Sequence, residues 1–233
     1  MIMGLRKRSA TLLGLTVLTL GLAAMSAPSE AISRTEGEER PEMMPRGFFL
    51  QPDQMSVDLT KYNNIDPGHI VPTRSLQQAL KYFDLNKGNI PNQRFITIIE
   101  FSKNSSQKRM YVIDLKSGAV QSFWVAHGRA SDPKDTGFAT HFSNKNNSDM
   151  SSLGFALSGS LYQGEHGTSM YLHGLEATNS NIYDRAIVMH GAAYVYPGHA
   201  GRSLGCPAIE LKYIHTLLPA IQGGSLMYMH YNQ

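Results

Sequence analysis

The chain has 233 residues, with 21 basic and 18 acidic side chains and a formal net charge of +3. The positive excess lies at the start of the chain, because without Arg6, Lys7 and Arg8 the basic and acidic residues number 18 each. The sequence has no basic patch interleaved with aromatic residues, the pattern typical of nucleic-acid-binding proteins. We therefore predict no nucleic-acid partner.

Residues 1–31 have the pattern of an export signal. Three basic residues precede an apolar stretch from Ala10 to Met25, and small residues follow at Ser26 and Ala31, where we expect cleavage. The stretch is shorter than the roughly 20 residues that span a bilayer, so an uncleaved anchor is the weaker alternative. The sequence predicts a periplasmic or secreted protein, associated with the cell wall and without stable membrane insertion after cleavage.

Two further segments follow the signal. Residues 32–60 are rich in Glu, Arg, Pro and Met and show no convincing period, which is typical of a linker or mobile arm. Residues 61–233 have the length of a single domain. Near its start, apolar residues recur at helical spacing over 74–84, and we predict a helix there with Thr73 as its cap.

The pattern then changes to short runs of β-branched and aromatic residues, which predict strands. These runs cover residues 94–101, 109–115, 119–126, 152–159, 169–175, 185–190 and 225–230. The second and third are joined by Lys116-Ser117-Gly118, a hairpin-type connection. Helical spacing returns only after Cys206, with Leu211, Ile214 and Leu218 on one side and an expected end at Pro219. Many short strands with a few short helices predict a mainly β fold, a sandwich or barrel.

Cys206 is the only cysteine and lies in the run RSLGCPAIE. In an oxidising compartment a lone thiol is buried and inert, paired with another molecule, or kept as a working thiol. Gly205 lets backbone amides approach a ligand closely, and Pro207 suits the first position of a helix. That helix would place Cys206 at its N-terminus, where the dipole favours a thiolate. We interpret Cys206 as a nucleophile rather than a small core residue.

A cysteine nucleophile needs a base. Four of the nine histidines form His-Gly pairs, at positions 127, 166, 173 and 190, so the dipeptide alone identifies nothing. His190 ends the most apolar short strand, and a strand end holds a base rigidly; we predict that His190 is the base. His127 also ends an apolar strand and is the second candidate.

Other catalytic classes lack their motifs. The sequence contains no HExxH, HxH or paired-cysteine spacing, so we predict no metal and no cofactor. It also lacks the G-x-S-x-G motif of a serine nucleophile.

The segment HGAAYVYPGHAGRSLGCPAIE resembles the active-site segment of the L,D-transpeptidases of bacterial peptidoglycan, whose pattern is His-Gly, a loop and Ser-x-Gly-Cys. The likeness runs from about residue 94 to the end, through KRMYVIDLKSG and VAHGRAS, and is closest to the murein catalytic-domain branch of this YkuD-like family. The chain has Leu204 where the family generally has His, and Pro207-Ala208 in place of Ile-Arg. Arg202 is a candidate to replace the missing arginine by pairing with a carboxylate. A solvated loop arginine is the alternative.

The resemblance implies an L,D-transpeptidase fold, and a catalytic domain over residues 61–233. It also implies that Cys206, activated by His190, forms a thioester with a peptidoglycan stem peptide, releases D-Ala and passes the acyl group to an amine. Backbone N–H groups of Gly205 and Cys206 would hold the oxyanion, and Ser203 would orient the histidine through its carbonyl or steady the loop. The candidates for contact with the substrate are Arg202, Gly191, Tyr194 and His127.

The acyl acceptor stays open at this point. With water as the acceptor the protein is an L,D-carboxypeptidase, and with a protein lysine it attaches or releases a wall protein. The rival of a different class is a non-catalytic cell-wall-binding domain, which the loss of Cys206 or His190 would favour. Both residues are present. The sequence predicts no particular protein partner.

Overall fold

The computed structural model describes residues 49–53 and 55–232. The chain divides into two units, residues 1–38 and 39–233, and every described residue belongs to the second. The predicted signal and most of the predicted arm therefore lie outside the described residues.

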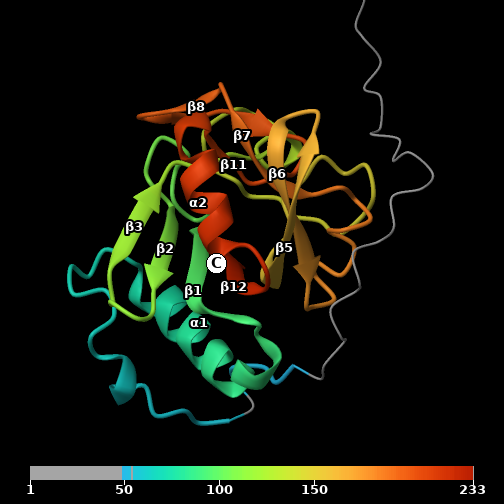
Figure 1. Cartoon of the computed structure of the whole chain (residues 1–233). Coiled ribbons are helices and arrows are strands. Elements are labelled where there is room, and N and C mark those ends of the chain that lie inside the picture. The colour runs from blue at the N-terminus through green and yellow to red at the C-terminus, as the bar shows by residue number, and fades with distance from the viewer. Residues whose placement is uncertain (1–48, 54, 233) are drawn as a thin grey trace, which may run out of the picture. The chain divides into compact units, whose positions relative to one another are not determined.

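Eight strands form the main sheet: β1 (Asn92–Glu100), β2 (Met110–Asp114), β3 (Val120–Phe123), β5 (Gly154–Gly164), β6 (Gly167–Gly174), β7 (Val188–Ala192), β11 (Ala208–Glu210) and β12 (Ser225–His230). Their spatial order is β11-β7-β6-β5-β12-β1-β2-β3 (Figure 1). Neighbours are antiparallel except for the parallel pairs β1–β12 and β7–β11. A bridge between Val125 and Ile209 joins the segment after β3 to β11, so the two edges of the sheet meet. The fold is a nearly closed, barrel-like β structure, which confirms the predicted class.

Four short strands and the helices complete the described part. Strand β4 (His127–Gly128) pairs in parallel with β10 (Arg202–Ser203), and β8 (Val195–Tyr196) forms a small hairpin with β9 (His199–Ala200). The two α-helices are α1 (Thr73–Leu85) and α2 (Ile214–Ile221). The 3-10 turns are η1 (Thr60–Tyr62), η2 (Lys87–Asn89), η3 (Arg129–Ser131) and η4 (Leu211–Tyr213). Within residues 49–53 and 55–232, no helix is long and apolar enough to cross a membrane.

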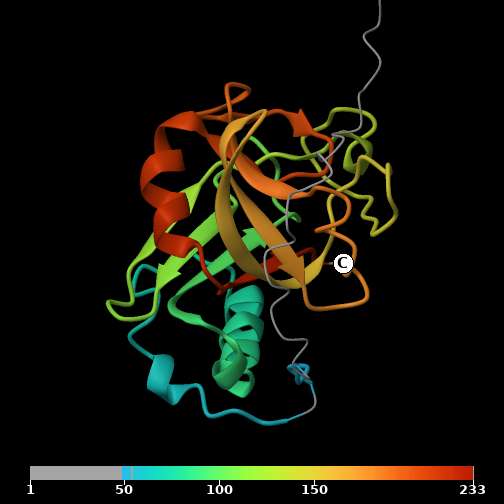
Figure 2. The same cartoon turned by 45° about the vertical axis from the view of Figure 1, so that its right-hand side comes forward.

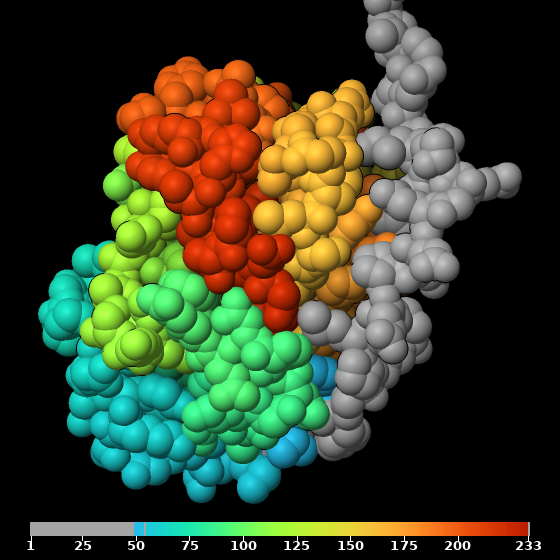
Figure 3. All heavy atoms as spheres, viewed as in Figure 1, coloured from blue at the N-terminus to red at the C-terminus, as the bar shows by residue number. Residues whose placement is uncertain are grey.

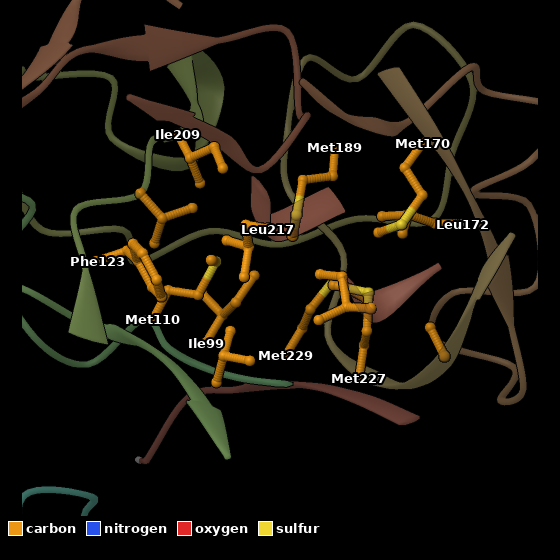
Figure 4. Packing of buried hydrophobic residues seen from close by; sticks show 14 of the residues in the cluster. Ile99, Met110, Phe123, Met170, Leu172, Met189, Ile209, Leu217, Met227 and Met229 are labelled. Atoms are coloured by element: carbon orange, nitrogen blue, oxygen red, sulfur yellow. The ribbon is translucent and has the colours of Figure 1, made fainter. Parts of the chain in front are cut away.

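Alternating side chains of the central strands fill two separate cores. Met227 and Met229 point to a core shared with α2, which Figure 4 shows from close by. Leu226 and Tyr228 of the same strand belong to a second core under α1. Because successive side chains of a strand point to opposite faces, each face of β12 is covered. Burying one large apolar side chain contributes about 1.5–3 kcal/mol, so the two cores hold the barrel that carries the site.

The two helices lie at different places on the barrel. Helix α1 packs against β1 and β12, whereas α2 packs against β1, β5 and β6. Both cartoon views show them apart (Figure 2). In the space-filling view the β5–β6 hairpin, in yellow, lies beside the red C-terminal region (Figure 3).

The predicted helix at 74–84 is confirmed as α1, but its cap is not. Thr73 is the first residue of the helix and Pro72 precedes it, with no side-chain hydrogen bond at the cap. The prediction for the segment after Cys206 is partly wrong. Strand β11 intervenes and α2 begins only at Ile214, while Pro219 lies inside the helix instead of ending it. Cys206 is therefore not at a helix N-terminus.

Part of the predicted arm packs on the domain. Leu50 N–H donates to Asn86 Oδ1 at 2.8 Å, and Asn86 Nδ2 donates back to Leu50 O at 2.9 Å. The Phe49 ring stacks on Tyr82 with centroids 6.2 Å apart. Asn86 directly follows α1, so residues 49 and 50 are fastened to the end of this helix rather than free.

Candidate active site

The parallel pair β7–β11 brings the two predicted catalytic residues to neighbouring positions. Ala208 of β11 lies opposite His190 of β7. Two residues earlier on each segment, the Val188 N–H donates to Cys206 Sγ at 3.5 Å. Cys206 therefore lies beside Val188, two residues and about 7 Å along the strand from His190. Cys206 and His190, the predicted nucleophile and base, lie on segments that are separated in the sequence by the residues between β7 and β11.

The Cys206 thiol is protonated at rest. The residue is half-buried, and Sγ donates to Ala186 O at 3.7 Å. Burial raises the pKa of the thiol above its ordinary value of 9.0, and the Val188 N–H and the Arg185 guanidinium only partly oppose this effect. The predicted activation by a helix dipole is wrong, because a strand follows the cysteine. Thiolate formation thus depends on a base.

His190 has the protonation state of a general base. Its side chain is buried, and Nδ1 lies 3.0 Å from Gly191 O. Because a carbonyl oxygen only accepts hydrogen bonds, Nδ1 carries the proton and Nε2 keeps a free lone pair. Burial lowers the pKa of His190 to about 4, despite the opposing Gly191 hydrogen bond; a positive charge on His166 lowers it further. The orienting carbonyl is that of Gly191 and not that of Ser203.

A second histidine, which sequence reasoning did not rank, stacks on His190. The rings of His166 and His190 stack with centroids 4.2 Å apart and planes 20° from parallel. His166 is exposed in the turn between β5 and β6. Its only sequence signal is that it belongs to one of the four His-Gly pairs, and the pairing of β6 with β7 decides which of them meets the base.

The Cys206 loop is held by Ser203 and requires glycine at position 205. Ser203 Oγ accepts the Gly205 N–H at 3.1 Å and donates to Cys206 O at 2.7 Å. Gly205 has φ +123°, and a Cβ there would lie 2.7 Å from Ile187 Cδ1 and 2.8 Å from Met150 O. Ser203 thus steadies the loop, as one of its two predicted roles stated. The Gly205 N–H is already engaged, so of the two predicted oxyanion donors the Cys206 N–H is the one left.

Arg202, which is half-buried, and His127, which is buried, lie next to each other beside this loop. Arg202 donates to Asp132 O at 2.8 Å and to Asp135 Oδ2 at 3.0 Å. His127 lies opposite Arg202 in the β4–β10 pair, is 0 % exposed, and has Nδ1 2.7 Å from Arg109 Nη2. Burial and the positive charge of Arg109 lower its pKa to about 4. Its neighbours enclose His127 completely in this structure, and its contact with the substrate stays a prediction. Arg202 is paired within the chain.

Gly191 and Tyr194 differ in their access to the site. A Cβ at Gly191 would lie 2.6 Å from Ile214 Cγ1 and 2.9 Å from Leu211 Cδ2, so the glycine is needed for close packing, and its contact with substrate stays a prediction. Tyr194 is 37 % exposed. Burial and the neighbouring Cys206 raise its pKa to about 12. Tyr194 therefore stays a candidate for the wall of the substrate site.

Arg185 binds the loop of residues 143–152, which in turn contacts the Cys206 segment. The guanidinium donates four hydrogen bonds of 2.6–3.0 Å, to Ser143 O, Ser152 Oγ, Ser148 Oγ and Met150 O. From the same loop, Ser151 Oγ donates to Gly205 O at 3.2 Å. Sequence reasoning missed Arg185, since an arginine at the start of an apolar run has no distinguishing pattern. Across the described part of the chain, no group of three or more His, Cys, Asp and Glu side chains is placed to hold a metal ion.

The sequence was compared with models of known protein families. The sequence profile of the L,D-transpeptidase catalytic domain matches residues 69–230, which is well over half of the chain. The chain belongs to this family. No curated protein gives a significant match.

Solved structures similar to this chain include an L,D-transpeptidase from Mycobacterium smegmatis, at 9 % identity and a TM-score of 0.37, covering 59 % of this chain and 58 % of that one. The L,D-transpeptidase of Xylanimonas cellulosilytica is 12 % identical with a TM-score of 0.36, and the match covers 65 % of this chain and 69 % of that one. The helical cell shape determining protein Pgp2 of Campylobacter jejuni is 15 % identical with a TM-score of 0.36, and the match covers 70 % of this chain and 58 % of that one. The chain thus spans less than two thirds of the length of the first and the third.

Proposed function

We propose that the protein is an exported cysteine acyltransferase that acts on the stem peptides of peptidoglycan, with Cys206 as nucleophile and His190 as base. The observation that carries this proposal is the β7–β11 pair, which sets a half-buried thiol two strand residues from a buried, neutral imidazole. The family assignment over residues 69–230 supports the same reaction class. Export rests on the sequence pattern of residues 1–31.

The directions of the two pKa shifts define the first chemical step. A raised thiol pKa and an imidazole pKa of about 4 favour the neutral pair at pH 7 over a thiolate–imidazolium pair. Nε2 of His190 therefore takes the proton as Sγ attacks the carbonyl carbon of the third stem residue. The C–S bond forms and the carbonyl electrons move to the oxygen, where the Cys206 N–H is the candidate donor. One such donor contributes about 3 kcal/mol of transition-state stabilisation.

Collapse of this intermediate completes the acyl transfer to the enzyme. The bond from the carbonyl carbon to the D-Ala nitrogen breaks, and the imidazolium returns its proton to the leaving amine. The thioester that remains is attacked by an incoming amine, which gives its proton to His190. The bond from the carbonyl carbon to Sγ then breaks, and Sγ takes this proton from the imidazolium, which restores the neutral pair. Tyr194, which is partly exposed beside Cys206, is the proposed wall of the stem-peptide site.

The test is incubation of the mature protein with tetrapeptide-containing muropeptides, followed by mass spectrometry, with Cys206→Ala as the control. Cross-linked dimer and free D-Ala, both lost in the variant, are the expected products. Tripeptide and D-Ala without dimer would identify an L,D-carboxypeptidase with water as acceptor. If neither protein changes the muropeptides, the proposal is wrong for this donor, and binding to insoluble peptidoglycan would then test the non-catalytic alternative.

A further inference from the structure

His166 covers one face of the proposed base. Its ring lies 4.2 Å from the His190 ring, centroid to centroid, and the planes differ by 20°. The two residues come from adjacent strands, since Ser169 of β6 lies opposite His190 of β7 and His166 immediately precedes β6. The stack therefore follows from the sheet register and joins the β5–β6 turn to the catalytic strand.

The stack supplies a constraint that the hydrogen bond of His190 lacks. Nδ1 is held by Gly191 O alone, at 3.0 Å, and one hydrogen bond fixes one edge of the imidazole but not the tilt of its plane. A flat ring lying against the face fixes that tilt. The same ring keeps water from this face of the base. Both effects act on the direction and basicity of Nε2.

The turn itself does not require histidine. His166 is exposed, and Gly167, which follows it, has φ +74° and open space around its Cα. The backbone pairing of β5 with β6 continues to Gly164 and Gly167 at the end of the hairpin. His166 is not among the residues with a positive φ, so its backbone places no special demand on the side chain, and the identity of the residue is available for a role at the site.

We propose that His166 is a positioning residue for His190: its ring holds the plane of the imidazole and shields it, so that Nε2 stays directed for proton transfer from Cys206. This inference rests on the proposed function. It predicts that a flat apolar ring can replace His166, whereas a small side chain cannot.

The experiment compares His166→Phe, which keeps a flat ring, with His166→Ala, which removes it. Glu165→Ala changes the neighbouring exposed residue of the same turn and is the matched control. We expect kcat for dimer formation to stay within about threefold of wild type in the Phe and Glu165 variants. In His166→Ala, kcat should fall about tenfold with little change in KM, while the melting temperature stays within about 2 °C.

A second readout does not need substrate. Titration of the His190 ring signals by NMR, in histidine-labelled protein, should give a pKa near 4 in wild type. In His166→Ala it should rise toward the ordinary value of 6.5 as water reaches the ring. In His166→Phe, which also lacks the histidine charge but keeps a covering ring, the rise should be smaller. If the His190 pKa is the same in the Phe and Ala variants, or if both variants lose activity equally, the proposal is overturned. A wild-type protein without turnover contradicts the proposed function instead, and the titration still decides on the stack.

Discussion

Gly205→Ala should destabilise the protein and displace the nucleophile. A side chain at φ +123° is strained by about 1–3 kcal/mol. The new Cβ would lie 2.8 Å from Met150 O, a backbone atom that Arg185 Nη2 holds at 2.6 Å. Relief of this contact moves one of two hydrogen-bonded loops by roughly 0.6 Å, since ordinary contact begins near 3.4 Å and the new Cβ would lie at 2.8 Å. We expect a total loss of about 3 kcal/mol in the free energy of unfolding.

Gly198→Ala is the matched control, because Gly198 has φ +79° and nothing within 4 Å of the new Cβ. This variant has only the strain of the positive φ and no steric contact, and it should lower the free energy of unfolding by about 1 kcal/mol. Urea unfolding of both variants and wild type measures the difference. In Gly205→Ala, kcat should also fall about 10- to 100-fold, since small displacements of a reacting atom are costly. Equal losses of stability in the two variants would refute the packing argument, and full activity would refute the positioning argument.

Four further predictions concern the thiol, its loop and the buried histidines. Cys206→Ser should fold normally, judged by circular dichroism, and show no turnover; full activity would end the proposed mechanism. In native wild type, iodoacetamide should modify Cys206 with a rate that still climbs above pH 9, because the thiol pKa is raised; complete protection until unfolding would mark a structural thiol. Ser203→Ala removes both loop hydrogen bonds and should lower the free energy of unfolding by about 2 kcal/mol, whereas Ser203→Thr, which keeps the hydroxyl, should lose less than half as much; equal losses would contradict the bonding. His127 and His190 have native pKa values of about 4 against 6.5 when unfolded, so the unfolded state binds more protons between these values. Stability should be complete above pH 6.5 and decline as the pH falls toward 4, by up to ~3 kcal/mol per histidine; urea unfolding that is unchanged from pH 7.5 to 4.5 would contradict their burial.

The fold could be predicted where local pattern and tertiary pairing agree. Residues 225–230 were predicted as a strand with the bounds that β12 has, since an uninterrupted apolar run suits a strand covered on both faces. Strand β11 was missed because Ala208–Glu210 is too short for any periodicity, and its pairing with β7 is what makes it extended. The resulting error moved a predicted helix terminus to Cys206 and reversed the expected sign of its pKa shift.

Some residues of the candidate site could be predicted from the sequence, whereas others are brought there only by tertiary pairing. Cys206 and His190 were predicted because one sequence segment contains both of them, and the structure brings them to neighbouring strands. Whether they are catalytic stays a prediction. His127 had the same sequence signal as His190, and only the placement of Arg109 shows that it is enclosed. His166 contacts His190 through the β6–β7 register, which no local pattern encodes.

The central position of β12 has a consequence for the order of assembly. The sheet consists of β11-β7-β6-β5 on one side and β1-β2-β3 on the other, and β12 joins them. During synthesis at roughly 5–20 residues per second, β1 waits until the chain from Glu100 to Ser225 has been made before its parallel partner exists. Until then one side of β1 is an unpaired edge that favours association with other chains. Strand β5, on the side of the sheet that leads to β7 and β11, likewise lacks its partner β12 until then. A newly made chain therefore lacks the complete eight-stranded sheet until β12 has been made and has paired with β1 and β5.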